Sequence, residues 1–195
     1  MELSNELIEE MLEFGKEKGY DEGTIEVSRH MIKSDSSNAY KFLIELRDLL
    51  RSRHGMNSLT SELEIMDILS IDEFISKRVD KLNDQIKLTE LFEKIEPDRR
   101  IDNPYEEKQE YDKSLFDKAV ALVEEKSSDA YPVLRQITNM IATEYGMINP
   151  EDELKLIEDL DPETYISLKL KKLNDQIVVA QLYDELEGKR RKSNQ

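Results

Sequence analysis

A six-residue string, KLNDQI, occurs twice in this chain of 195 residues and constrains its fold more than any other feature. It spans 81–86 and returns unchanged at 172–177, an offset of 91 residues. With that offset, 36–96 aligns with 127–187 without a gap, and 20 of the 61 aligned pairs are identical. Self-similarity at a fixed period is the signature of repeat architectures, so the match predicts a tandem duplication.

The two repeats differ at their N-terminal ends. The alignment extends weakly back to residues 23 and 114, where Ile25 aligns with Phe116 and Ile32 with Val123. Residues 1–22 have no aligned counterpart, although their apolar residues recur at helical spacing. We therefore expect an N-terminal helix that the second repeat lacks.

Apolar residues recur at intervals of three and four along most of the chain, which is typical of amphipathic helices. No segment of four or more residues shows convincing strand alternation, and six glycines and five prolines are few for this length. The sequence predicts an all-α fold with about four helices in each repeat, packed with pseudo-twofold symmetry or side by side. The expected helices span 3–18, 22–34, 36–54, 60–69, 71–95, 150–160 and 162–187.

Several expected helix ends have capping residues. Ser36-Ser37-Asn38 has side chains that accept backbone N–H groups at helix N-termini, and Ser70 with Glu73 forms a capping-box pattern. Gly55 and Gly146 stand where a left-handed C-cap is expected.

The pattern divides the chain into four parts. We expect a first helical repeat at 1–96, a polar linker at 97–113 and a second helical repeat at 114–187. The last residues, 188–195, are basic, and we expect them to form a disordered tail.

Composition excludes several classes of protein. Lys and Arg total 28 against 44 for Asp and Glu, a formal net charge of −16, which disfavours direct nucleic-acid binding. The chain has no cysteine, so it has no disulfide, thiolate metal site or thiol nucleophile, in keeping with a cytoplasmic protein. We expect no membrane association, because no apolar run approaches the roughly 18 residues of a membrane span and the acidic N-terminus does not resemble a signal peptide.

The polar residues inside KLNDQI are the candidate site. Leu82 and Ile86 are four apart and are expected to face the core, so their polar neighbours point partly away from it. Three interpretations stay open: a patch presented to a partner protein, a hydrogen-bond network between repeats or helices, and recent duplication with little divergence. The candidate residues are Asn83, Asp84, Gln85, Asn174, Asp175 and Gln176.

Catalytic and metal chemistry find little support in the sequence. Glu26 and His30 have a plausible metal-ligand spacing on a helix, but Asp117 and Ala121 stand at the aligned positions. Neither a phosphate-binding loop nor a serine-nucleophile motif is present. We therefore expect no enzyme activity, no catalytic or metal-binding residues and no cofactor.

By elimination, we expect a non-enzymatic adaptor, regulator or inhibitor that binds another protein, and homodimerisation stays open. One alternative is an acidic mimic of nucleic acid, as a phage or mobile element might encode. It requires a continuous acidic face that Lys77, Lys81, Lys87 and Lys172 do not interrupt. A second alternative is a helical-bundle enzyme that uses carboxylates and His30.

Overall fold

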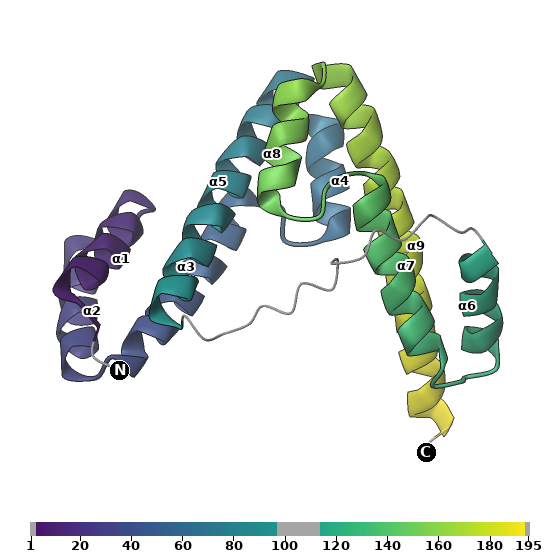
Figure 1. Cartoon of the computed structure of the whole chain (residues 1–195), viewed down its shortest axis with the longest axis horizontal. Coiled ribbons are helices and arrows are strands. Elements are labelled where there is room, and N and C mark those ends of the chain that lie inside the picture. Colours follow the sequence, from purple (N-terminus) through teal and green to yellow (C-terminus); the bar gives the residue numbers. More distant parts are fainter. Residues whose placement is uncertain (1–2, 97–113, 194–195) are drawn as a thin grey trace. The chain divides into compact units, whose positions relative to one another are not determined.

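The computed structural model describes residues 3–96 and 114–193, with side chains up to Gly188. Every regular element in these residues is an α-helix, which confirms the all-α fold class (Figure 1). The linker expected at 97–113 lies outside the described residues.

The helices follow the expected order. Their bounds are α1 Asn5–Glu17, α2 Glu22–Ser34, α3 Ser37–His54, α4 Leu59–Ile68, α5 Ile71–Ile95, α6 Ser114–Glu124, α7 Ala130–Glu144, α8 Pro150–Asp159 and α9 Pro162–Ser193. Most ends lie within one or two residues of the expected positions. The exception is α9, whose backbone stays helical through residues 188–193, where we expected a disordered tail. Lys and Arg are good helix formers and their charges suit a helix C-terminus, so this basic segment continues the helix.

The expected C-caps and the capping box are confirmed. Gly55 and Gly146 have φ angles of 68° and 64°, a left-handed conformation that glycine adopts without steric cost. The Ser70 backbone N–H donates to the Glu73 carboxylate at 3.0 Å, and the Glu73 N–H faces the Ser70 hydroxyl at 3.4 Å. These ends are set by local chemistry, which is why the sequence could identify them.

The N-cap of α3 differs from the expectation. Ser36 adopts helical backbone angles and its side chain makes no capping hydrogen bond. Instead, the Asp35 carboxylate accepts the Ser37 backbone N–H at 2.9 Å. A carboxylate is the better acceptor for a helix N-terminus because its negative charge also interacts favourably with the helix dipole.

The described helices belong to two compact units. Unit 1 comprises Met1–Asn57 and Lys77–Ile101, and unit 2 comprises Ser58–Ser76 and Asp102–Gln195, so the boundary lies within α5. Helix α4 precedes α5 in sequence but belongs to unit 2, where it packs on α9. The division into repeats and their packing, pseudo-twofold or side by side, stay predictions.

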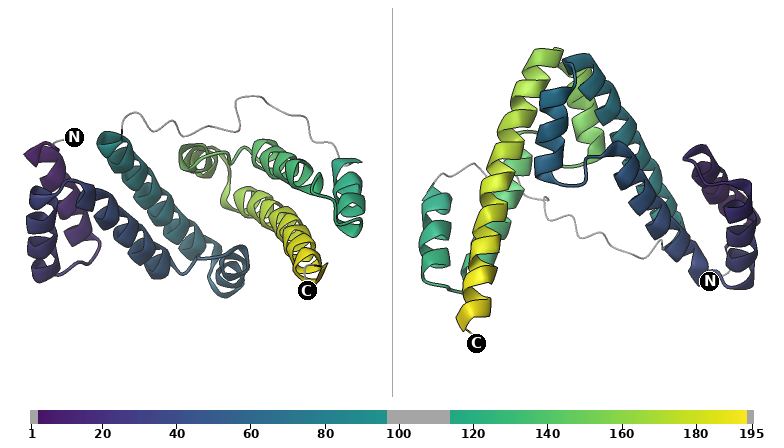
Figure 2. Two further views of the ribbon diagram at one scale, coloured as in Figure 1. Left: turned by 90° about the horizontal axis from the view of Figure 1, so that it is seen from below. Right: turned by 180° about the vertical axis from the view of Figure 1, so that it is seen from behind.

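In unit 1, α1, α2, α3 and the part of α5 from Lys77 onward enclose one apolar core. Helix α1 lies beside α2 in both views of Figure 2, and it also contacts α3. The core comprises Ile8, Met11, Leu12, Phe14, Ile25, Ile32, Ala39, Phe42, Leu43, Leu46, Leu50, Leu88, Leu91 and Ile95.

In unit 2, α6 and α7 pack on each other and on α9, and α4 and α8 also pack on α9. The long helix α9 therefore contacts every other helix of the unit that lies wholly within it. The core comprises Ala119, Val123, Ala130, Val133, Leu134, Ile137, Ile141, Val179, Leu182 and Leu186.

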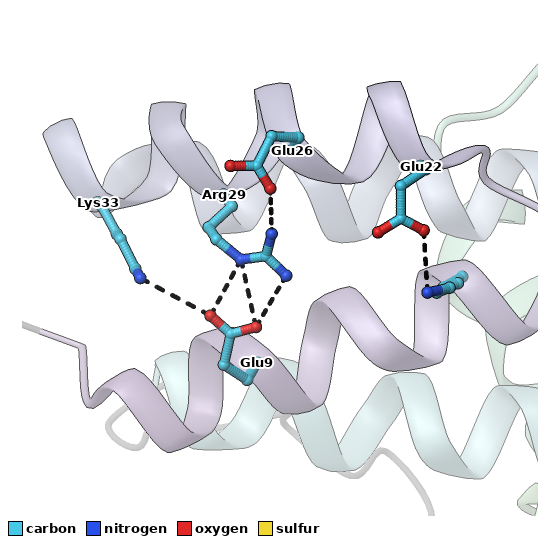
Figure 3. A network of polar contacts seen from close by, with 6 residues as sticks. Glu9, Glu22, Glu26, Arg29 and Lys33 are labelled. Atoms are coloured by element: carbon cyan, nitrogen blue, oxygen red, sulfur yellow. Dashed lines mark hydrogen bonds and ion pairs between the residues drawn. The ribbon is translucent and has the colours of Figure 1, made fainter.

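Ion pairs fix the position of α1 within unit 1. On the α2 side, the Arg29 guanidinium donates to the Glu9 carboxylate, Nη2···Oε2 3.0 Å (Figure 3). On the α5 side, the Glu10 carboxylate accepts from the ammonium groups of Lys87 at 2.6 Å and Lys94 at 2.8 Å. Hydrogen bonds from Arg29 lower the pKa of Glu9, and those from Lys87 and Lys94 lower the pKa of Glu10.

The close approach of α1 to α3 predicts that Gly15→Ala destabilises unit 1. A Cβ at Gly15 would lie 2.7 Å from the ring tip of buried Phe42 and 3.0 Å from Tyr20. Overpacking costs about 1–3 kcal/mol, which exceeds the gain of about 1 kcal/mol in helix propensity. We expect a net loss of about 1 kcal/mol in urea unfolding monitored by circular dichroism. Gly188→Ala in α9 is the matched control, and since nothing lies within 4 Å of its Cβ it should be neutral or stabilising.

The position of Glu10 predicts an acid-sensitive attachment of α1. Its folded-state pKa is depressed, so its stabilising contribution is complete above the unfolded value of about 4.3 and is lost as pH falls through the folded value. Glu10→Gln should lower the free energy of unfolding at pH 7 by up to about 1 kcal/mol, a small effect because the ion pair is partly exposed. The variant should also lose less stability than the native chain when the pH falls below 5. An unchanged pH profile would contradict the pairing, and Glu17→Gln on the same helix serves as the control.

Candidate functional site

The structure separates the KLNDQI residues into inward-facing and outward-facing positions. Leu82 and Leu173 are buried, as expected. Asn83 and Asn174 are exposed, and the Gln85 and Gln176 side chains are exposed and half-buried, respectively. Asp84 is buried and Asp175 is half-buried, so both aspartates point inward.

Asp84 joins three helices of unit 1. Its Oδ2 lies 2.8 Å from Nε2 of His54, the last residue of α3. Its Oδ1 forms an ion pair with the ammonium of Lys18, at the C-terminal end of α1, at 2.7 Å. One carboxylate on α5 therefore contacts the C-terminal ends of both α1 and α3.

Asp175 makes the corresponding contact in unit 2. The Tyr145 hydroxyl donates to Asp175 Oδ2 at 2.7 Å, and Tyr145 is aligned with His54 at the 91-residue offset. In each unit the aspartate of KLNDQI thus binds the ring that directly precedes the left-handed glycine.

The lysine of KLNDQI also repeats its contact. Lys81 Nζ donates to the Met56 carbonyl at 2.9 Å, and Lys172 Nζ donates to the Met147 carbonyl at 2.8 Å. Each carbonyl belongs to the residue after the left-handed glycine. Lysine and aspartate therefore hold a helix end within one unit, whereas the side chains of Asn83, Gln85 and Asn174 are exposed.

A buried charge cluster in unit 2 was missed by the sequence analysis. The ammonium of Lys169 on α9 lies 3.0 Å from Glu62 Oε1 of α4 and 2.8 Å from Glu153 Oε1 of α8. The exposed fractions of these side chains are 3%, 8% and 4%, and the Tyr165 hydroxyl donates to Glu153 at 2.8 Å. Glu62 and Glu153 are aligned at the 91-residue offset, and this identity was the one sequence signal that could have pointed to the cluster. Helical spacing alone does not distinguish them from exposed carboxylates.

The cluster is built for packing, because the lysine occupies the space between the two carboxylates. The expected absence of a metal site is not contradicted: no group of three or more His, Asp or Glu side chains in the described residues could hold a metal ion. Glu26 and His30 are both exposed, and Glu26 pairs with Arg29.

None of the helices in 3–96 and 114–193 is long and apolar enough to cross a membrane.

An open depression on unit 2 is the candidate binding surface. It encloses about 670 Å³ between α7 and α9, and we call it the Tyr–Arg depression. The rings of Tyr131 and Tyr183 lie 6.2 Å apart, and the Tyr131 hydroxyl donates to the Glu187 carboxylate. Burial raises the pKa of Tyr183, opposed by the charge of Arg135. Its lining residues are Tyr131, Pro132, Arg135, Gln136, Asn139 and Tyr183.

The depression was also missed by the sequence analysis. The aromatic pair has aligned counterparts in Tyr40 and Phe92, whose rings lie 5.5 Å apart in unit 1. Arg135, however, aligns with Ile44. The retained aromatic pair was a signal for helix packing, and only the tertiary structure places a guanidinium beside it.

Comparison with known proteins finds no matching family model, no matching curated protein and no matching solved structure.

The buried charge cluster predicts that Lys169→Met strongly destabilises unit 2. Two buried carboxylates would lose the ammonium group that contacts both of them, and breaking a buried ion pair costs about 3–5 kcal/mol. Lys171→Met, at an exposed position of the same helix, should change the free energy of unfolding by no more than about 0.5 kcal/mol. Urea unfolding of the two variants gives the comparison.

A triple variant separates charge from packing. Replacing Lys169, Glu62 and Glu153 together by methionine removes every charge named in the cluster and should recover most of the loss, since apolar residues often substitute for buried ion pairs. A triple variant as unstable as Lys169→Met would show that side-chain shape, not unpaired charge, sets the cost.

Proposed function

We propose that this chain is a non-enzymatic, cytoplasmic protein-binding adaptor, regulator or inhibitor built by tandem duplication of a helical unit. The observation on which the proposal rests is the Tyr–Arg depression, where two tyrosines and an arginine meet on an open surface of unit 2. Tyr and Arg are enriched among the residues that dominate the binding energy of protein interfaces.

The shape of the depression favours a macromolecular partner. Small-molecule sites bury most of the surface of their ligand in an apolar cleft. Here, Arg135 and Pro132 are exposed and the other lining residues are half-buried, so the depression is open and its lining mixes aromatic and polar side chains. Protein interfaces combine aromatic residues and arginine with polar groups in the same way.

The buried carboxylates support a structural rather than a catalytic use of the acidic residues. Asp84 contacts His54 and Lys18, and Glu62 and Glu153 contact Lys169. Each of these contacts joins different helices of one unit. The acidic residues most shielded from water are therefore occupied in holding the fold together.

Nucleic-acid mimicry is the second candidate, and one observation favours it. Lys81 and Lys172 donate to backbone carbonyls, and Lys87 pairs with Glu10, so these amines interrupt an acidic face less than the sequence suggested. A mimic would bind a basic cleft through exposed ionic contacts, which salt screens.

A pull-down from lysate of the source cells with the tagged full chain tests the proposal. We expect the native chain to capture a protein that stays bound at 1 M salt. The Arg135→Glu variant should capture at least tenfold less of that protein. Charge reversal at this lining residue replaces an attractive contact with a repulsive one, hence the loss. Lys171→Glu, with the same charge change at another exposed position of unit 2, is the control and should retain the partner.

Other results would contradict the adaptor proposal. A nucleic-acid-binding partner that is released by salt would favour mimicry. Recovery of the bait alone, or equal capture by Arg135→Glu and Lys171→Glu, would remove the Tyr–Arg depression as the binding surface.

A further inference from the structure

The charged side chains of α2 are engaged in ion pairs on the side of the helix that faces α1 (Figure 3). Near the start of α2, Glu22 pairs with Lys16 of α1 at 2.9 Å. Further along, Arg29 and Lys33 both pair with Glu9 of α1, at 3.0 and 3.7 Å. The charged residues of α2 are Glu22, Glu26, Arg29 and Lys33, and Glu26 pairs with Arg29.

The face of α2 that points away from the core carries no charged side chain. Ile25 and Ile32 are buried in the core of unit 1, and with 3.6 residues per turn Val27 and Met31 lie on the other side of the helix. These two are four residues apart and therefore adjacent on the surface, and their exposed fractions are 61% and 47%. We call this face, about three turns long, the α2 strip. Its exposed residues are Gly23, Val27, His30, Met31 and Ser34.

The α2 strip is self-complementary in volume. Val27 lies midway between Gly23 and Met31, four residues from each. If two copies of α2 pack antiparallel with Val27 against Val27, Met31 of each copy lies opposite Gly23 of the other. The longest apolar side chain of the strip then meets the position that has no side chain, which suits the interlocking of large and small residues in helix packing.

The order of charges along α2 selects the same orientation. Its first half is acidic, with Glu22 and Glu26, and its second half is basic, with Arg29 and Lys33. Antiparallel packing brings the acidic half of one copy beside the basic half of the other, on the same flank of the helix pair. Parallel packing would instead bring together halves of like charge, which repel each other.

We propose that the α2 strip binds the α2 strip of a second copy of this chain, antiparallel, with Val27 at the twofold axis. A twofold interface uses the same patch on both copies, so it requires the self-complementarity that the strip has. The inference concerns unit 1 and goes beyond the proposed function, which rests on the Tyr–Arg depression of unit 2. One short helix from each copy makes a small interface, so the dimer is weak and depends on concentration.

The absence of charge also favours a second copy over other segments of the chain. Two copies with a net charge of −16 repel each other, so their contact is least opposed where an exposed face carries no charge. Residues 97–113 include ten charged residues among 17, and 188–195 include no large apolar residue. Neither segment offers an apolar face that matches Val27 and Met31.

Sedimentation velocity of the full chain tests the proposal. The concentration should range from about 5 to about 500 μM, where weak interfaces associate. We expect the mass to rise from 22.9 kDa toward twice that value as the concentration increases. A monomer at every concentration would overturn the proposal.

Two matched variants test whether the α2 strip is the surface involved. Val27→Glu places two carboxylates at the twofold axis and should weaken the dimer at least tenfold. Ile68→Glu makes the same kind of change at an apolar residue of unit 2 that is 79% exposed, and it should dimerise like the native chain. Because both positions are exposed, both variants should keep the native circular dichroism spectrum. A dimer that survives Val27→Glu, or that is lost equally with Ile68→Glu, would overturn the proposal.

Single cysteines test the antiparallel arrangement, because the native sequence has no cysteine. Val27→Cys should form a disulfide-linked dimer under mild oxidation, since the two copies of residue 27 meet at the twofold axis. Met31→Cys should not, because its two copies lie about 12 Å apart along the helix axis, whereas a disulfide requires Cβ atoms about 4 Å apart. No disulfide with Val27→Cys, or equally rapid disulfide formation by both variants at equal dimer fractions, would overturn this arrangement.

Discussion

The packing of unit 2 depends on one buried ammonium group. Lys169 on α9 contacts Glu62 of α4 and Glu153 of α8, and all three side chains are shielded from water. Unpaired charges in the interior are costly, so a packing of α4 and α8 that brings their carboxylates to the lysine is favoured. Apolar contacts alone tolerate small shifts of a helix. The shared ammonium group favours one choice of the residues of α4 and α8 that face α9. Only 38% of the residues of the chain are hydrophobic, so apolar contacts alone would select this packing less strongly.

The repeated KLNDQI string has a physical explanation in the helix ends. In both units its lysine binds the carbonyl that follows a left-handed glycine, and its aspartate binds the ring that precedes that glycine. The lysine thereby gives a donor to a carbonyl just beyond the helix end, where the backbone carbonyl has no helical partner. The exchange of His54 for Tyr145 keeps a donor opposite the aspartate. These contacts account for the lysine and the aspartate, and they do not explain why the asparagine and the glutamine are also identical in the two strings.

Sequence reasoning identified what local chemistry determines. Helix order, the glycine C-caps and the capping box at Ser70 follow from spacing and backbone preference within a few residues. The end of α9 was wrong because a basic composition was interpreted as disorder although it also favours a helix C-terminus. The buried Glu62 and the Tyr–Arg depression could not be identified, because both depend on which helices become neighbours in space. In a chain with 37% charged residues, a buried glutamate has the same helical spacing as an exposed one.

The two units use related positions for opposite purposes. In unit 1, a guanidinium and three amines form ion pairs with Glu9 and Glu10 of α1. In unit 2, the aligned positions hold two exposed valines and two glutamates, a combination that α1 cannot complement. The ion pairs that hold α1 in unit 1 therefore cannot form at the aligned positions of unit 2, since a valine has no charge and a glutamate repels another glutamate. Identity between aligned segments thus predicts the shared helix-end contacts of KLNDQI, but not the contacts of α1.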